Sequence, residues 1–246
     1  MQTDNNVLIG GFIITGNTSK KVIVRGIGPS LQSNGIVNYL ADPTLELHDK
    51  NGLIASNDNW RTNQETEIQS SGLAPANDLE SAIVVTLAPG GYTAILRGNN
   101  GATGIGLVEV YVDLASDSKL ANISARGFVQ TGDDVMIAGF VFGNGTASEK
   151  VIIRCIGPSL TGMGIADVLA DPTLALHDGN GTLLISDDNW NDDARQAAQI
   201  IAAGLAPSND FESAIATTLP PGAYTAIVAG KNGGTGVALA EVFHLP

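Results

Sequence analysis

The chain has 246 residues, of which 43% are hydrophobic, only 15% are charged and 30 are glycine. This composition favours glycine-turned β structure with enough apolar residues for two cores, and it excludes a disordered chain or a helical bundle. The net charge of −13 argues against nucleic-acid binding, because counterion release needs a basic surface. No apolar run approaches the length of about 20 residues that a membrane span requires, so we expect no membrane span.

Two long stretches of the sequence are near copies of each other. Lys21–Leu31 (KVIVRGIGPSL) returns as Lys150–Leu160 (KVIIRCIGPSL), and further blocks recur in the same order after both. A period of about 130 residues is too long for a solenoid repeat and matches one ordinary domain. The sequence therefore predicts two tandem copies of one domain, residues 1–114 and 115–246.

Short runs rich in β-branched residues alternate with glycine turns along each copy. In copy one these runs are, in chain order, Val7–Ile14, Lys21–Ile27, Thr44–Asp49, Leu53–Ser56, Ser81–Leu87, Gly91–Gly98 and Gly104–Asp113. One short helix is expected in each copy, over Asn63–Ser71 and over Asp193–Ala203, where Asp193 takes the N-cap position. The pattern predicts an all-β protein of two tandem antiparallel β-sandwich domains, jelly-roll-like, each with one short helix.

Copy two has a strand-like segment that copy one lacks. Leu120–Val129 (LANISARGFV) precedes copy two, and no similar segment precedes Val7–Ile14 of copy one. Domain one is therefore predicted to lack the first strand. We expect an unpaired sheet edge beside Val7–Ile14, and such an edge is a template for a strand of another chain.

Acidic and amide residues gather in the turns of both copies. In copy one they are Asp42, Asp49, Asn51, Asn57, Asp58, Asn59, Asn77, Asp78 and Glu80, and copy two repeats the set. Calcium takes about six to eight oxygen ligands, which loops at one end of a sandwich can supply. Asp and Asn are also ordinary turn formers that bond their own backbone. The residues alone leave both alternatives open.

Three blocks carry a resemblance to a known family. Asp42–Trp60, Glu80–Gly98 and Gly101–Tyr111, with their counterparts in copy two, resemble the bacterial pre-peptidase C-terminal domains, a family that includes the collagen-binding domains of clostridial collagenases. The shared pattern is D-x-x-L-x-L-x-D-x-x-G, then N-D-D, then P-A-G-x-Y before a last strand. The resemblance implies a secreted jelly-roll accessory domain with Ca²⁺ near the N-D-D loop. It implies the metal candidates Asp49, Asn57, Asp58, Asp178, Asp187 and Asp188.

Four charged residues interrupt apolar strands. They are Arg25, Glu109, Arg154 and Glu241. Charges in such strands are normally paired when they are buried, so we expect structural ion pairs between neighbouring strands rather than catalytic carboxylates.

Trp60 and Trp190 directly follow the acidic loops. These two side chains are either platforms on which a sugar could stack or lids on the sandwich core.

Nucleophile patterns are weak in this sequence. Ser30 and Ser159 lie in Gly-Pro-Ser-Leu, which lacks the second glycine of a G-x-S-x-G elbow. His48 and His177 stand beside an aspartate, so a Ser–His–Asp site is formally possible, but a solvated histidine and a loop-capping serine explain the same residues. The sequence has no H-E-x-x-H, C-x-x-C or phosphate-binding glycine loop. We expect no enzyme.

Together these features predict a non-catalytic extracellular structural protein, secreted or on the cell surface. It would be a surface or appendage subunit that self-associates through sheet edges into a homo-oligomer or filament. The alternative is a calcium-dependent accessory module of a secreted hydrolase that binds a polysaccharide or a matrix protein.

Overall fold

The chain divides into two compact units, Met1–Ile123 and Ser124–Pro246. The structure is a computed structural model that describes residues 7–112, 119–132, 134–143 and 147–245. The predicted boundary between residues 114 and 115 lies outside the described residues. The division falls within strand β8 (Lys119–Val129), because Leu120 and Ile123 pack against the core of unit 1, whereas Phe128 packs against a cluster of unit 2.

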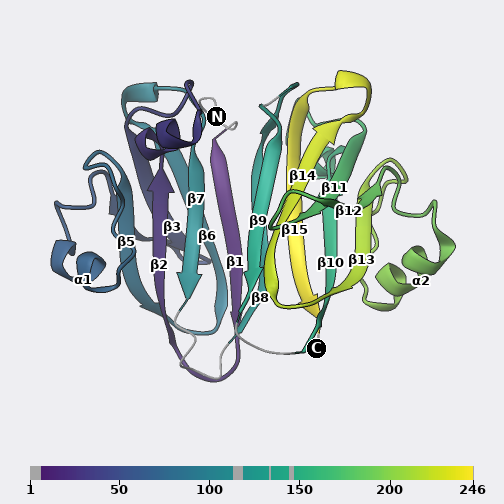
Figure 1. The fold of residues 1–246 in the computed structure, drawn as a ribbon, viewed down its shortest axis with the longest axis horizontal. Coiled ribbons are helices and arrows are strands. Elements are labelled where there is room, and N and C mark those ends of the chain that lie inside the picture. Colours follow the sequence, from purple (N-terminus) through teal and green to yellow (C-terminus); the bar gives the residue numbers. More distant parts are fainter. Residues whose placement is uncertain (1–6, 113–118, 133, 144–146, 246) are drawn as a thin grey trace. The chain divides into compact units, whose positions relative to one another are not determined.

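Unit 1 is a sandwich of two antiparallel sheets, with orders β1-β6-β3-β4 and β5-β2-β7 (Figure 1). Its strands are β1 (Leu8–Thr15), β2 (Lys20–Ile27), β3 (Pro43–Asp49), β4 (Gly52–Asn57), β5 (Ser81–Leu87), β6 (Gly90–Gly98) and β7 (Leu107–Val112). Helix α1 (Glu65–Ser70) precedes β5 and buries Ile68.

Unit 2 repeats this sandwich and adds β8. Its sheets have the orders β12-β11-β14-β9 and β13-β10-β15-β8. The strands are β9 (Met136–Phe142), β10 (Glu149–Ile156), β11 (Pro172–Asp178), β12 (Leu183–Asp187), β13 (Ser213–Leu219), β14 (Gly222–Gly230) and β15 (Gly236–Leu245). Helix α2 (Ala194–Ala202) is capped by Asp193, whose carboxylate accepts the N–H groups of Arg195 and Gln196. Counted from β8, this order of eight strands is that of a jelly roll, so the predicted fold class is confirmed.

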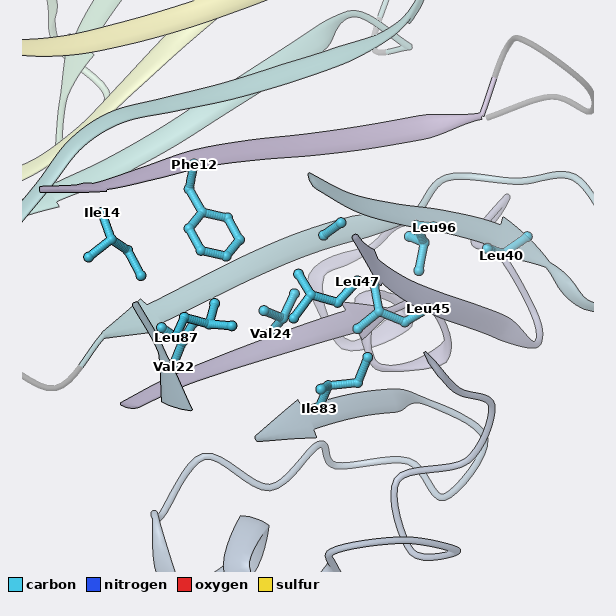
Figure 2. Close-up of a cluster of buried hydrophobic side chains, with 11 residues drawn as sticks. Phe12, Ile14, Val22, Val24, Leu40, Leu45, Leu47, Ile83, Leu87 and Leu96 are labelled. Carbon is cyan, nitrogen blue, oxygen red and sulfur yellow. The ribbon is translucent and has the colours of Figure 1, made fainter. Parts of the chain in front are cut away.

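Alternation along the strands places the core between the two sheets. In β3, Leu45 and Leu47 are fully buried, whereas Glu46 and His48 are only partly covered. Figure 2 shows how the buried side chains of unit 1 meet, with Phe12 from β1 facing Val24 and Leu47. The core is built from leucine, isoleucine and valine with few aromatics, which explains how a chain poor in aromatics still fills two sandwiches.

A short 3-10 turn follows the second strand of each unit. In unit 1 it is η2 (Pro29–Asn34), and in unit 2 it is η4 (Pro158–Met163). The residue before each proline must be glycine, because there is no room for a side chain. A side chain on Gly28 would collide with the carbonyl oxygen of Leu40, and one on Gly157 with that of Leu169. The repeated Ile-Gly-Pro-Ser-Leu sequence therefore encodes a close crossing of two backbone segments.

Two further 3-10 turns, η3 (Asn99–Gly101) and η5 (Lys231–Gly233), follow β6 and β14. Within the described ranges, none of the helices is long and apolar enough to cross a membrane.

The crossing at Gly157 gives a stability prediction. We expect Gly157→Ala to lower the free energy of unfolding by about 1–3 kcal/mol, the usual cost of overpacking, because the new methyl group meets the Leu169 carbonyl. Gly162→Ala, in the same turn but with open space around its Cα, should raise stability by about 0.4–1 kcal/mol. Urea unfolding of the two variants measures both effects, and equal changes would contradict the steric explanation.

Candidate functional site

The most buried acidic side chain of unit 1 belongs to Glu80, which is fully inaccessible to solvent. Its Oε1 accepts the N–H groups of Gly28 at 3.1 Å and Ser30 at 2.8 Å. Its Oε2 accepts the hydroxyl of Ser30 at 2.7 Å and the N–H of Asn77 at 3.2 Å. This carboxylate thus holds the Gly-Pro-Ser turn against the start of β5, and the hydrogen bonds replace the water that it loses.

Glu212 does the same in unit 2. It is also fully buried, and it accepts the N–H groups of Gly157 and Ser159 and the hydroxyl of Ser159, at 2.8–3.0 Å. Ser30 and Ser159 are therefore structural ligands of a glutamate. The histidines point to other partners, since His48 contacts Glu46 and His177 contacts the carbonyl of Gly181. A Ser–His–Asp arrangement is not assembled from these residues.

The predicted arginine–glutamate pairs are present in both units. Arg25 donates from Nε to Glu109 at 2.8 Å, and Arg154 donates from Nε to Glu241 at 2.6 Å. Each arginine also donates to a loop carbonyl, that of Leu73 or Leu205. The side chains are largely but not wholly buried, so these pairs tie the loop before β5 or β13 to the sheet, and both Glu109 and Glu241 are engaged in them.

The two arginine–glutamate pairs differ in the aromatic residue beside them. In unit 1 the hydroxyl of Tyr111 donates to Glu109 at 2.9 Å, and in unit 2 the corresponding residue is Phe243. Burial, followed by the hydrogen bond to Glu109, raises the pKa of the Tyr111 phenol. Each arginine stacks over its aromatic ring at 5.0 Å.

Four of the six metal candidates are used by local structure. Asp49 and Asp178 cap hairpin turns, accepting the N–H groups of Asn51 and Asn180. Backbone hydrogen bonds, first from Thr182, lower the pKa of Asp178. Asn57 and Asp187 accept the N–H groups at the starts of β5 and β13, from Ala82 and Ala214. Burial raises the pKa of Asp187, and nearby acidic residues add to that rise.

The remaining candidate of unit 1, Asp58, lies beside Asp42. Burial, with the charge of Asp42 second, raises the pKa of Asp58. Asn99 donates to Asp42 at 2.9 Å. Asp42 Oδ1 and Asn59 Oδ1 are buried atoms without a hydrogen-bond partner among the described residues. Unit 1 therefore brings the carboxylates of Asp42 and Asp58 near each other and near the Asn99 amide, and no lysine or arginine among the described residues forms a salt bridge with them.

Unit 2 has a lysine at the corresponding place. Lys231, which occupies the position of Asn99, lies 2.6 Å from Asp188 and 3.7 Å from Asp171. These contacts raise the pKa of the Lys231 ammonium, the hydrogen bond to Asp188 most of all. The two units thus present the same carboxylate pair, once with its own cation and once without. In the described ranges, no group of three or more His, Cys, Asp or Glu side chains is arranged to hold a metal ion.

The two tryptophans differ in their exposure to solvent. Trp60 is only 2% exposed, donates from its ring to the carbonyl of Asn77 and is covered by Arg61 at 4.1 Å. Trp190 is partly exposed and packs against the cluster formed by Ile152, Ile200 and Ala214. Trp60 is therefore a lid on the core, which leaves no face for sugar stacking in unit 1.

A sheet edge distinguishes the two units more than any side chain. In unit 2 the last strand, β15, pairs with β10 on one side and β8 on the other. In unit 1 its counterpart β7 ends a three-stranded sheet, with no strand on its far side within the described part of the chain. The unpaired edge predicted beside Val7–Ile14 is not present, because β1 has β8 as its hydrogen-bonded neighbour on the side away from β6. The unpaired edge is that of β7, because a jelly roll pairs its first strand with its last and the described part of unit 1 lacks the first.

Burial follows the pairing. On β15, Val237, Ala238, Ala240 and Val242 are buried. In unit 1 the matching stretch runs from Ile105, just before β7, to Val110 on β7. It is only partly covered, and Leu107 is 39% exposed. Unit 1 therefore keeps the apolar residues at the edge of this sheet but, in the described ranges, has no strand in the position that β8 takes in unit 2.

Sequence reasoning missed the two most constrained sites. The sequence pattern places Glu80 and Glu212 among the acidic turn residues, whereas the structure buries both. The recurrence of Glu-Ser after each Asn-Asp turn, together with Gly-Pro-Ser, is the sequence signal that links each glutamate to its serine. The carboxylate pair of Asp42 and Asp58 could be found only by noting that Lys231 in copy two replaces Asn99.

Comparisons with known proteins give no family. No family model matches the chain, and no curated protein matches it. Among solved structures it is similar to the STIV MCP, with 14% identity, 99% of this chain and 93% of that chain covered, and a TM-score of 0.27. It is also similar to the PBCV-1 virus capsid, with 9% identity, 99% and 95% covered, and a TM-score of 0.23. Scores this low carry no argument about function.

Exchanging the residues at positions 99 and 231 tests whether a lysine stabilises the carboxylate pair. Asn99→Lys should stabilise unit 1 by about 0.2–1 kcal/mol, the range for partly exposed ion pairs, because it supplies the cation that Lys231 supplies in unit 2. Because the folded-state pKa of Asp58 is raised, its contribution to stability is present at low pH and lost as pH rises through that pKa. The gain from Asn99→Lys should therefore be larger at pH 7 than at pH 4.

Thermal unfolding at both pH values measures this difference, and Lys231→Asn is the matched control. That variant should lower the melting temperature at pH 7. A stabilisation by Asn99→Lys that does not depend on pH would contradict the electrostatic explanation.

Proposed function

We propose that this protein is a non-catalytic structural subunit of extracellular or cell-surface assemblies, which associates through an unpaired sheet edge of unit 1. The observation that carries the proposal is the free edge of β7, where unit 2 has β8. Edges of this kind are templates for strand addition unless they are charged, bulged or covered.

The residues of β7 support this proposal. The strand has the sequence Leu-Val-Glu-Val-Tyr-Val, and its single charge, Glu109, is already paired with Arg25. It contains no proline and no lysine, the residues that most often protect an edge. If β7 pairs with a different segment of a second copy, the contact is head-to-tail, and copies joined by it form an open chain unless the rotation closes a ring. If β7 pairs with β7 of a second copy, the contact is two-fold symmetric and closes as a dimer.

A non-catalytic role is supported by what the reactive groups do. Ser30 and Ser159, each the second residue of a 3-10 turn, bind a buried glutamate. The two arginine–glutamate pairs hold the loops that precede β5 and β13. Each of these groups is thus explained by a structural contact.

The proposal predicts concentration-dependent association. Sedimentation velocity over a hundredfold range of protein concentration should show species larger than the monomer at the upper end. Leu107→Lys should shift this equilibrium toward monomer by at least tenfold, because a charge at the edge opposes pairing. Ile201→Lys, on the exposed surface of α2, is the matched control and should change nothing. A monomer at every concentration would contradict self-association.

A second candidate function is calcium-dependent binding through unit 1. The observation that favours it is the pair Asp42 and Asp58, whose counterparts in unit 2 hold the ammonium of Lys231. Buried oxygen atoms without a described hydrogen-bond partner occur in both units, at Asp42 and Asn59 and at their counterparts Asp171 and Asn189, so the missing ammonium is what distinguishes unit 1. Carboxylate and amide oxygens are ligands that calcium accepts.

Calcium would then stabilise the folded protein by linkage, by about 2.7 kcal/mol at a hundred times its dissociation constant. Differential scanning calorimetry in calcium and in chelator measures this gain. Asn99→Lys should abolish the gain, because its ammonium would occupy the position of the ion. Identical melting curves of the wild-type protein in the two buffers would rule out this candidate.

A further inference from the structure

Four apolar residues at and near the edge of β7 correspond one by one to residues that contact Phe128 in unit 2. There, Phe128 of β8 packs against a cluster that includes Ile156, Leu160, Val237 and Leu239. The repeat places Ile27, Leu31, Ile105 and Leu107 at the same four positions of unit 1.

Solvent exposure differs between the two sets. Leu160 and Val237 are each 1% exposed. Their counterparts Leu31 and Ile105 are partly exposed, and Leu107 is exposed. Ile27 and Ile156 are equally buried, at 6% and 7% exposed, so the difference is confined to the other three positions. At these positions the apolar side chains are more exposed in unit 1 than in unit 2. The difference coincides with the presence or absence of a strand at the edge.

From this comparison we infer that unit 1 binds an extended polypeptide strand of the β8 type, supplied by a separate molecule. The strand would pair with β7, as β8 pairs with β15, and would insert an aromatic side chain between Leu31, Ile105 and Leu107. This inference rests on the proposed function, because it names the partner for the same edge.

The chemistry of the strand follows from β8. Between Leu120 and Val129 it carries small and β-branched residues, one glycine next to the aromatic residue, and a single charge at Arg126. The chain's own β8 is already paired in unit 2. The occupant is therefore not a strand already paired in a folded sheet but a segment of the partner molecule that is extended before it binds.

Peptide binding tests the inference. A fluorescent peptide with the sequence of Lys119–Val129 (KLANISARGFV) should bind the whole protein saturably, as measured by fluorescence anisotropy. Replacement of the phenylalanine in the peptide by serine should weaken binding at least tenfold, and this comparison needs no change in the protein. Leu107→Lys should weaken binding to the same extent, and Ile201→Lys should leave it unchanged. Thermal unfolding checks that both variants fold.

Hydrogen exchange locates the bound strand. Added peptide should slow the exchange of backbone amides of β7 and leave those of β15 unchanged. Protection of β15 would mean that the peptide displaces β8, and it would overturn the inference, as would absent binding or equal binding of the two peptides. A protein that self-associates but does not bind the peptide would keep the proposed function and lose this inference. A protein that stays monomeric but binds the peptide would contradict self-association and keep the strand-binding site on β7.

Discussion

Each unit is organised around one carboxylate that is removed from water. Glu80 in unit 1 and Glu212 in unit 2 accept hydrogen bonds from the Gly-Pro-Ser turn that follows the second strand. A buried charge is tolerated only when such bonds replace its hydration. The turn must therefore keep one geometry relative to the start of β5 in unit 1 and of β13 in unit 2. That turn carries the chain from one sheet of the sandwich to the other. Leu31 and Leu160 lie in these turns, so their positions depend on the same geometry.

The duplication shows which features the fold needs and which it can vary. Both units keep the buried glutamate, the arginine–glutamate pair and the glycine at the crossing of two backbones. They differ at the surface carboxylate pair, where a lysine in one unit is an asparagine in the other. Exposed charges contribute little to stability, so such a position is free to change, whereas a buried charge without its partners would cost several kcal/mol.

The edge strand differs for a reason of the same kind. A sandwich can remain folded without its first strand, because the remaining strands of unit 1 still form two sheets around a filled core. The loss appears locally, as partly exposed apolar residues at Leu31, Ile105 and Leu107 beside the unpaired edge of β7. A fold that tolerates an open position of this kind can receive a strand there, which makes the position suited to assembly.

The sequence by itself determined the elements that depend on local pattern. Alternating residues located β3, an Asp-capped segment located α2, and charges within apolar strands indicated the pairing of Arg25 with Glu109. The tertiary structure alone decided which acidic residues are buried, which ones meet, and where the open edge lies. Glu80 and Asp49 look alike in sequence, because both are acidic residues in turns. In the structure Glu80 is fully buried, whereas Asp49 caps an exposed hairpin turn. Strand order is set by contacts between distant segments, so the position beside β7 could not be found from local pattern.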